Sequence, residues 1–266
     1  MAVNNNIKML KPAEVRAVIR KDMWDKPTTG IAMGYAQANL VILPQKYALD
    51  FFLFCQRNPK PCPVLEVLEP GEYQPDFLAA AADVRTDAPQ YNVYVKGRLK
   101  ESLKNIKEIW RDDLVTFFLG CSLSFEEAMI RAGIAVRHID EDKNVPMYVT
   151  NMQCRPAGIF HGPMVVTMRP VQPEKVVKVV QVTSRYSSVH GGPVHIGDPG
   201  IIGIKNLGKP DFGDPVMIQA GEMPIFWACG VTPQAALMAA KPDICITHAP
   251  GHMFITDILN EELATT

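Results

Sequence analysis

The sequence predicts an α/β fold: a three-layer domain built on a parallel sheet, with a smaller α+β domain inserted into it. Two observations lead to this prediction. Short apolar runs are followed by a tight loop and then by a helical pattern, and this unit recurs, as in parallel sheets with covering helices. Between the units lies a stretch of different character, rich in Gly, Pro and β-branched residues. We therefore expect a discontinuous parallel-sheet domain of residues 1–132 and 221–266, with residues 133–220 as the inserted domain.

The first third of the chain is predicted to be mainly helical. Pro12 suits a first helical turn, and apolar residues follow it at helical spacing, so a helix is expected over residues 12–21. Residues 45–57 are apolar almost all round, which predicts a buried helix. The remaining elements expected here are strands at residues 64–68 and 91–95 and an amphipathic helix at residues 98–111.

Three apolar runs carry the recurring unit. Each is expected to be a strand that ends in a tight polar loop: residues 114–119, 225–228 and 244–247. Helices are expected after the first two, at residues 125–132 and 233–240. The inserted stretch predicts strands at residues 146–150 and 164–168, and residues 174–182 fit either a strand or one helical face.

Composition excludes several classes of protein. The 266 residues carry a formal charge of -1, so the basic excess of a nucleic-acid binder is missing. Apolar residues make up 47% and charged residues 21%, which are globular values, and no apolar run approaches the ~20 residues that span a bilayer. The amino terminus lacks the apolar core of a secretory signal, and the six cysteines form no C-x-x-C pair. We expect a soluble, cytoplasmic protein with reduced thiols that contacts neither nucleic acid nor membrane.

The ends of the three recurring strands are the first candidate site. They carry GCSLSFEE, ACGVTPQ and THAPGH, and ligands bind beyond the carboxyl ends of parallel strands, so these groups are expected to converge. Ser124 and Glu127 have capping-box spacing, and Thr232 precedes Pro233 as an N-cap does. Free N–H groups at such helix starts favour an anion, and Ser122, Ser124 and Thr232 are therefore expected to bind substrate. The alternative is that they are ordinary caps.

Cys121 and Cys229 occupy the strand-to-helix turns of two of these loops. A nucleophile elbow has this position, and a helix start would lower the pKa of a thiol. Neither cysteine lies in a G-x-S-x-G frame, so small residues in tight turns are the competing interpretation.

The densest polar cluster spans residues 183–198. Its histidines, His190 and His195, are candidate acids or bases, and Arg185 is a candidate carboxylate clamp. Ser184 and Asp198 are expected to bind substrate beside them. Several glycines in the cluster allow the backbone to approach a ligand closely.

His248 and His252 form a further candidate pair. They are four residues apart, but Pro250 and Gly251 prevent a regular helix from presenting both on one face. A loop could instead bring His248, His252 and Asp257 to one point. A divalent cation is therefore left open as a cofactor. The other candidates outside the cluster are Glu222, expected to be catalytic, and His161.

Two further observations concern His138 and the absence of nucleotide-binding motifs. His138 adjoins charged residues and is expected at the surface. Neither a P-loop nor a G-x-G-x-x-G motif occurs, which weighs against kinases, P-loop ATPases and Rossmann dehydrogenases.

Together, the polar motifs resemble the D-glutamate cyclase family, whose bacterial members are often named hydro-lyases. The resemblance covers nearly the whole chain, with Tyr186 and Phe212 as aromatic variants, and is strongest from Gly120 to Asp257. It rests on GCSLSFEEAM, RHID, NVPMYVTNMQC, PAGIFHGPMVVTMRP, VTSRYSSVHGGPVHIGDPGIIGI, PDFGD, GEMPIFWACGVTPQ and THAPGHMFITD. It implies a two-unit α/β architecture and a lyase that eliminates water, with cyclisation of D-glutamate to 5-oxo-D-proline as the named activity.

The chemistry of that reaction gives the candidate residues their roles. Cyclisation needs a neutral amine and a carboxyl group that is protonated or held by positive groups. Arg185 and the helix start after Cys121 are expected to hold carboxylates, and His190 and His195 to move protons. His248 and His252 are expected to complete the relay or to hold a divalent cation.

Other functions remain open from the sequence. The alternatives are a hydratase or dehydratase of another small carboxylic or amino acid, a non-catalytic binder of such acids and a metal-dependent hydrolase. The expected partner is a small acid substrate, and the apolar helices indicate self-association.

Overall fold

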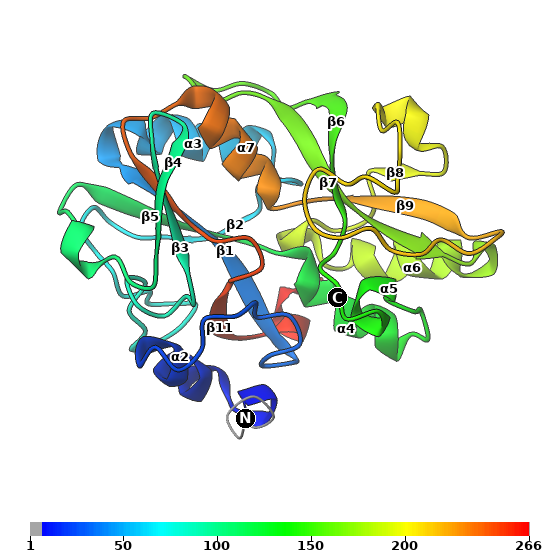
Figure 1. Ribbon diagram of the computed structural model, residues 1–266, viewed down its shortest axis with the longest axis horizontal. Coiled ribbons are helices and arrows are strands. Elements are labelled where there is room, and N and C mark those ends of the chain that lie inside the picture. Colours follow the sequence, from blue (N-terminus) through cyan, green and yellow to red (C-terminus); the bar gives the residue numbers. More distant parts are fainter. Residues whose placement is uncertain (1–6, 266) are drawn as a thin grey trace.

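The computed structural model describes residues 7–265. Residues 1–6 and 266 lie outside the described residues. The prediction that the amino terminus is not a secretory signal falls partly on residues 1–6. Two β-sheets lie side by side, with helices packed around them (Figure 1). No helix of the described part combines the length and apolarity needed to cross a membrane.

The first sheet has seven strands in the order β2-β5-β1-β10-β3-β4, and β11 pairs with a further part of β1. Its strands are β1 (Tyr35–Pro44), β2 (Val64–Val67), β3 (Tyr91–Val95), β4 (Arg98–Leu103), β5 (Leu114–Leu119), β10 (Cys245–His248) and β11 (Phe254–Leu259). The second sheet has the order β6-β7-β9-β8. Its strands are β6 (Met147–Gln153), β7 (Pro163–Val171), β8 (His195–Ile196) and β9 (Met223–Ala228).

Six α-helices and seven 3₁₀ turns complete the described part of the chain. The helices are α2 (Pro12–Arg20), α3 (Gln45–Arg57), α4 (Glu126–Arg131), α5 (Arg137–Asp140), α6 (Val176–Ser184) and α7 (Val231–Ala240). The 3₁₀ turns are η1 (Ile7–Met9), η2 (Lys107–Ile109), η3 (Ser122–Phe125), η4 (Pro173–Lys175), η5 (Ser187–Val189), η6 (Pro199–Ile202) and η7 (Asn260–Leu263).

The mixed α/β class is confirmed, but the parallel sheet is wrong. Every described strand pair is antiparallel, including the pairs that β1 makes with β5, β10 and β11. The sequence reading missed β1, which is the centre of the first sheet and is buried along almost its whole length. Continuous apolar runs are typical of strands that are buried on both faces, and such strands usually belong to parallel sheets. Here helices and loops cover both faces of antiparallel sheets, so the apolar runs did not reveal the direction of the strands.

Most expected elements are confirmed, with three differences. Helix α3 forms at residues 45–57, but the burial expected for it is wrong, because only one face is buried and Leu49, Phe52 and Leu53 are exposed. The strand expected at residues 225–228 forms as β9, but it pairs with β7 and β8 in the second sheet. The division of the chain into two domains at residues 132 and 220 stays a prediction. The helix expected at residues 98–111 is wrong, because Lys96 and Gly97 both have positive φ and close a two-residue hairpin from β3 into β4. Residues 174–182, which fitted either state, are largely helical in α6.

Successive side chains of β1 point to opposite faces of the first sheet, and a hydrophobic core lies on each face. Leu40 and Ile42 pack on one face with side chains from the segment between β2 and β3. Val41 and Leu43 pack on the other face against α3 and α7. The second sheet repeats this scheme, with α4 and α6 over one face and residues 202–218 over the other.

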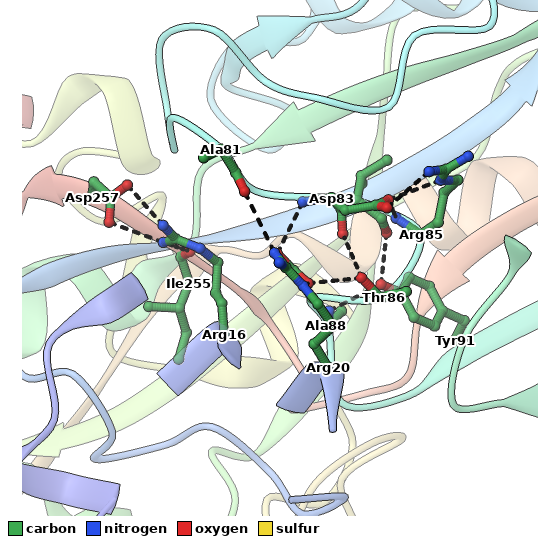
Figure 2. Close-up of polar contacts among 12 residues, drawn as sticks. Arg16, Arg20, Ala81, Asp83, Arg85, Thr86, Ala88, Tyr91, Ile255 and Asp257 are labelled. Carbon is green, nitrogen blue, oxygen red and sulfur yellow. Dashed lines mark hydrogen bonds and ion pairs between the residues drawn. The ribbon is translucent and has the colours of Figure 1, made fainter. Parts of the chain in front are cut away.

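Helix α2 is attached to the first sheet by two arginine–aspartate pairs (Figure 2). Arg16 donates to both carboxylate oxygens of Asp257, at 3.0 and 2.8 Å, and to the carbonyl of Ile255 at 2.9 Å. Arg20 forms a similar two-pronged pair with the buried carboxylate of Asp87, at 2.8 and 2.5 Å. The first pair holds the amino-terminal helix against β11, and the second holds it against the segment before β3.

Candidate active site between the two sheets

A cavity of about 50 Å³ lies where the two sheets meet, a size that restricts any ligand to a small molecule. All three loops singled out in the sequence line it, as do strand residues from both sheets. The lining residues are Thr29, Asn39, Cys121, Ser122, Leu123, Asn144, Val145, Met147, Thr167, Cys229, Gly230, Val231, Gln234, His248, Pro250, Gly251 and Met253. The loops thus meet although their strands belong to two antiparallel sheets.

Behind the cavity wall lies a buried ion pair that holds Ser122. Arg169, 0% exposed, donates to Ser122 Oγ at 3.2 Å, to Thr167 Oγ1 at 3.0 Å and, through Nε, to Glu126 Oε1 at 3.1 Å. His138 Nε2 lies 3.1 Å from the same carboxylate oxygen. Burial by itself would raise the pKa of Glu126, but the charge of Arg169 and the contact with His138 outweigh it and lower that pKa. The network thus holds Ser122 in place at the cavity wall, and its buried charges compensate one another.

This network was missed in the sequence, and the surface position expected for His138 is wrong. His138 is 1% exposed, because the single turn of α5 directs it inward toward Glu126 while Asp140 stays outside. The residue in the sequence that could have indicated this buried network is Arg169. A charged residue within the otherwise apolar run of β7 must either leave the core or find a buried partner.

His248 contributes a neutral hydrogen-bond donor to the cavity. Its Nδ1 accepts the backbone N–H of Leu40 at 3.1 Å, so the ring proton resides on Nε2. Burial lowers the pKa of His248 to about 4, so the imidazole is uncharged at neutral pH. At that pH the side chain can donate from Nε2 but cannot accept a proton there.

Gln234 and the start of α7 add donors to the same cavity. The buried Nε2 of Gln234 has no hydrogen-bond partner. Gly230 and Val231, at the start of α7, lie at the cavity wall, where the free N–H groups of a helix favour an anion. Only glycine fits at position 230, because a Cβ there would lie 2.2 Å from Nδ2 of Asn39. Asn39 in turn donates to the carbonyl of Gly120 at 2.8 Å and so ties the loop after β5 to β1, beside Gly230.

The two cysteines of the cavity are protonated thiols. All six cysteines of the chain are unpaired, as expected. Burial raises the pKa of Cys121 to about 12 and that of Cys229 to about 11. A helix start is therefore not enough here to make a thiolate, and the position of the thiols in tight turns has a packing explanation.

Both predicted helix caps are wrong. No capping box forms at residues 124–127, since α4 begins after Phe125 and Ser124 Oγ is buried without a partner. Thr232 lies inside α7, where its hydroxyl accepts from the N–H of Val165 at 3.0 Å and lies 3.2 Å from the carbonyl of that residue. Neither side chain lines the cavity.

The cluster at residues 183–198 also lies outside the cavity lining. His190 is buried in the left-handed conformation, with φ of 85°, and its Nδ1 donates to the carbonyl of Lys60 at 2.8 Å. His195 donates to the carbonyl of Asp198 at 2.7 Å, and the Asp198 carboxylate accepts the N–H of Gly200 at the start of η6.

Arg185 and Ser184 follow at the exposed end of α6. The Arg185 Nε donates to the carbonyl of Thr265 at 3.3 Å. The structure therefore distributes the cluster of residues 183–198 over several local contacts, and the catalytic and binding roles expected for its members stay predictions.

The remaining candidates make contacts of their own. His252 lies within hydrogen-bond distance of the carbonyls of Pro250, at 2.9 Å, and Asp25, at 3.2 Å. Glu222 accepts from Arg137 at 2.6 Å, and His161 is exposed. Asp257 is taken up by Arg16. Within residues 7–265, no three His, Cys, Asp or Glu side chains are arranged to hold a metal ion.

Comparison with known proteins places these features in a family. The chain matches the family described as D-glutamate cyclase over residues 115–257. Two relatives are named "Putative hydro-lyase". The one from Thermoanaerobacter sp. (strain X514) is 60% identical over 259 residues, 97% of this chain and 98% of the relative. The one from Bacillus subtilis (strain 168) is 60% identical over 255 residues, 96% and 99% of the two chains.

Among solved structures, the chain matches a nitrogen repressor-like protein from Methanococcus jannaschii. The TM-score is 0.40 at 10% identity, over 88% of this chain and 90% of that chain. A likeness this low supports no argument about fold or function.

Proposed function

This chain belongs to the D-glutamate cyclase family, and from that premise we propose that it is a hydro-lyase that closes D-glutamate to 5-oxo-D-proline in the cavity between its two sheets. Relatives that share 60% of its residues over almost the whole chain are named hydro-lyases, which supports a lyase that eliminates water. The finer assignment, to D-glutamate, rests on the family and on the character of the cavity.

The observation that carries the proposal is a cavity lined by donors but by no charged side chain of the described residues. His248 offers Nε2–H, and Gln234 offers an amide without a partner. The start of α7 adds a partial positive charge. Such a wall suits a carboxylate, because hydrogen bonds and a helix start stabilise the anion without a counter-charge.

The same wall suits ring closure of an amino acid that carries both reacting groups. In an uncharged cavity the ammonium proton of glutamate can pass to its own γ-carboxylate, which leaves an amine and a carboxylic acid. The amine nitrogen then attacks the carbon of the γ-carboxyl group, and the new C–N bond forms. The C–OH bond breaks, and the hydroxyl leaves as water with one of the amine protons, so the lactam keeps the other.

His248 has a defined part in these steps. Its neutral Nε2–H can donate to the γ-carboxyl oxygen on which negative charge develops during the attack. The cavity supplies the folded pose that brings amine and carboxyl together, a contribution worth several kcal/mol in comparable intramolecular reactions. Dehydration of another small acid would need a base to remove a C–H proton. No lining residue is an ionised base at neutral pH, which favours cyclisation over that alternative.

The experiment is chiral chromatography of the purified protein incubated with D- or L-glutamate, with and without a metal chelator. We expect 5-oxo-D-proline from the D-isomer alone. Replacing the donor in His248→Gln should lower kcat/KM by on the order of 100-fold, the effect of removing one such donor. His252→Gln is the matched control, since His252 contacts only backbone carbonyls and should retain nearly full activity.

Two results would count against the proposal. If the folded wild-type protein forms no product from either isomer, D-glutamate is not the substrate. If His248→Gln retains the kcat/KM of the wild type, the donor role of His248 is wrong. Thermal unfolding of both variants shows whether a loss of activity reflects a loss of structure.

A further inference from the structure

A second cavity, of about 60 Å³, adjoins the candidate active site. It shares Thr29 and Leu123 with the candidate active site but is otherwise lined by different residues. The remaining lining residues come from the loop before β1, from β1, α4 and α5, and from η7: Gly30, Ile31, Ala32, Met33, Gly34, Tyr35, Gln37, Glu126, Glu127, Ile130, Ile139 and Asn260.

Two hydrogen-bond acceptors in this lining have no donor. Asn260 is 4% exposed, and its Oδ1 is buried without a partner. The Oε2 of Glu127 is likewise buried and unpartnered. A buried acceptor that is left unsatisfied costs free energy, so two of them in one cavity point to a ligand that brings donors.

Gly34 lies beside both of these residues, which line the same cavity. Its carbonyl accepts the backbone N–H of Asn260 at 2.8 Å. A Cβ at Gly34 would lie 3.6 Å from Oε2 of Glu127, and Gly34 itself has φ of 91°, which an L side chain rarely adopts. The absent side chain therefore leaves open the region that both acceptors border.

The charge in this cavity is negative. The charge of Glu126 is balanced by Arg169. The other oxygen of Glu127, Oε1, lies only at 4.0 Å from Arg131, whose guanidinium donates to Glu261 at 2.7 Å. Glu127 thus keeps a largely uncompensated carboxylate toward the cavity.

We propose that this second cavity binds a primary ammonium group, separately from the site of ring closure. An ammonium group offers N–H donors to both free acceptors and a positive charge to Glu127. Ile130 and Ile139 form an apolar wall that can contact the carbon of an alkylammonium. Among the described residues no three His, Cys, Asp or Glu side chains are arranged to hold a metal ion, which favours an ammonium over a divalent cation.

Binding is tested without glutamate, so the outcome does not depend on the proposed reaction. Calorimetric titration and thermal unfolding are followed with ammonium, methylammonium, tetramethylammonium and potassium chlorides at constant ionic strength. We expect saturable heat and a saturable rise in Tm with ammonium or methylammonium, but with neither of the other two. A stronger response to methylammonium would identify an organic amine as the ligand class, and a stronger response to ammonium would identify the free ion.

Variants locate the site. Glu127→Gln keeps the size of the side chain and should weaken binding at least 10-fold, as should Asn260→Leu. Glu174→Gln, at an exposed carboxylate outside the cavity lining, is the control and should bind like the wild type. The proposal is overturned if no salt gives a saturable response, if potassium or tetramethylammonium binds equally well, or if Glu127→Gln binds as the wild type does. If Asn260→Leu does not fold, Glu127→Gln alone decides.

Discussion

Lowering the pH from 7.5 to 5 is expected to destabilise the folded protein through two buried histidines, His190 and His248. Burial lowers the pKa of each from 6.5 to about 4. In the unfolded chain each ring takes up a proton near pH 6.5, whereas in the folded protein it stays neutral down to about pH 4. Between these values the unfolded state binds more protons, so the free energy of unfolding falls as the pH falls.

The size of the effect follows from the two pKa values. Each histidine should remove about 1.4 kcal/mol per pH unit within this window, which amounts to about 2 kcal/mol at pH 5 relative to pH 7.5. The two together should remove about 4 kcal/mol, a large part of the 5–15 kcal/mol that stabilises a typical protein. Their contribution is fully present above pH 6.5 and is lost as the pH approaches 4.

Urea unfolding at pH 7.5, 6 and 5 measures this loss. His190→Asn removes one titrating group, and asparagine tolerates the left-handed backbone that His190 adopts. This variant should lose only about 2 kcal/mol between pH 7.5 and 5, because one buried histidine remains. His195→Asn, at a partly exposed ring, is the control and should lose as much as the wild type.

The reasoning is refuted if His190→Asn and the wild type lose the same free energy over this range. Equal losses would mean that His190 is protonated in the folded state or that water reaches its ring before the chain unfolds.

Two further predictions concern buried groups near the candidate active site. Arg169→Met should lower the free energy of unfolding by about 3–5 kcal/mol in urea, since it leaves Glu126 buried without its main partner, whereas Arg169→Met with Glu126→Leu should lose less. A loss below about 1 kcal/mol in the single variant would contradict this account of the ion pair. Cys121 and Cys229 should react with iodoacetamide at pH 8 at least 100-fold more slowly in the folded protein than in urea, because burial raises their pKa values to about 12 and 11. Equal rates, measured by mass spectrometry, would show that the thiols are accessible and ionised.

Local patterns in the sequence were sufficient for many elements and for the place of the cavity. The spacing of apolar residues identified α2, because one-sided burial leaves its period in the chain, whereas α3 and β5 were identified as continuous apolar runs. The polar loops after β5, β9 and β10 stood out because Gly, Pro and small polar residues follow apolar runs there, and these three loops line one cavity.

Long-range contacts decided the remaining features. Strand direction depends on where the connections lead, and an apolar strand such as β1 is equally apolar in either direction. The inward position of His138 depends on Glu126, and the buried pair of Glu126 with Arg169 joins residues 43 positions apart. The protonation states of His248, Cys121 and Cys229 depend on how deeply the folded chain buries them.

The sequence by itself therefore determined that this is an α/β chain of the D-glutamate cyclase family, with polar loops that end three strands. Only the tertiary structure decided that the sheets are antiparallel, that the loops meet between them, and that His248 rather than the cluster at residues 183–198 lies at the cavity. The physical reason is that periodicity and turn chemistry act between neighbours in the chain. Burial, charge pairing and the pKa values that they set arise between residues that only folding brings together.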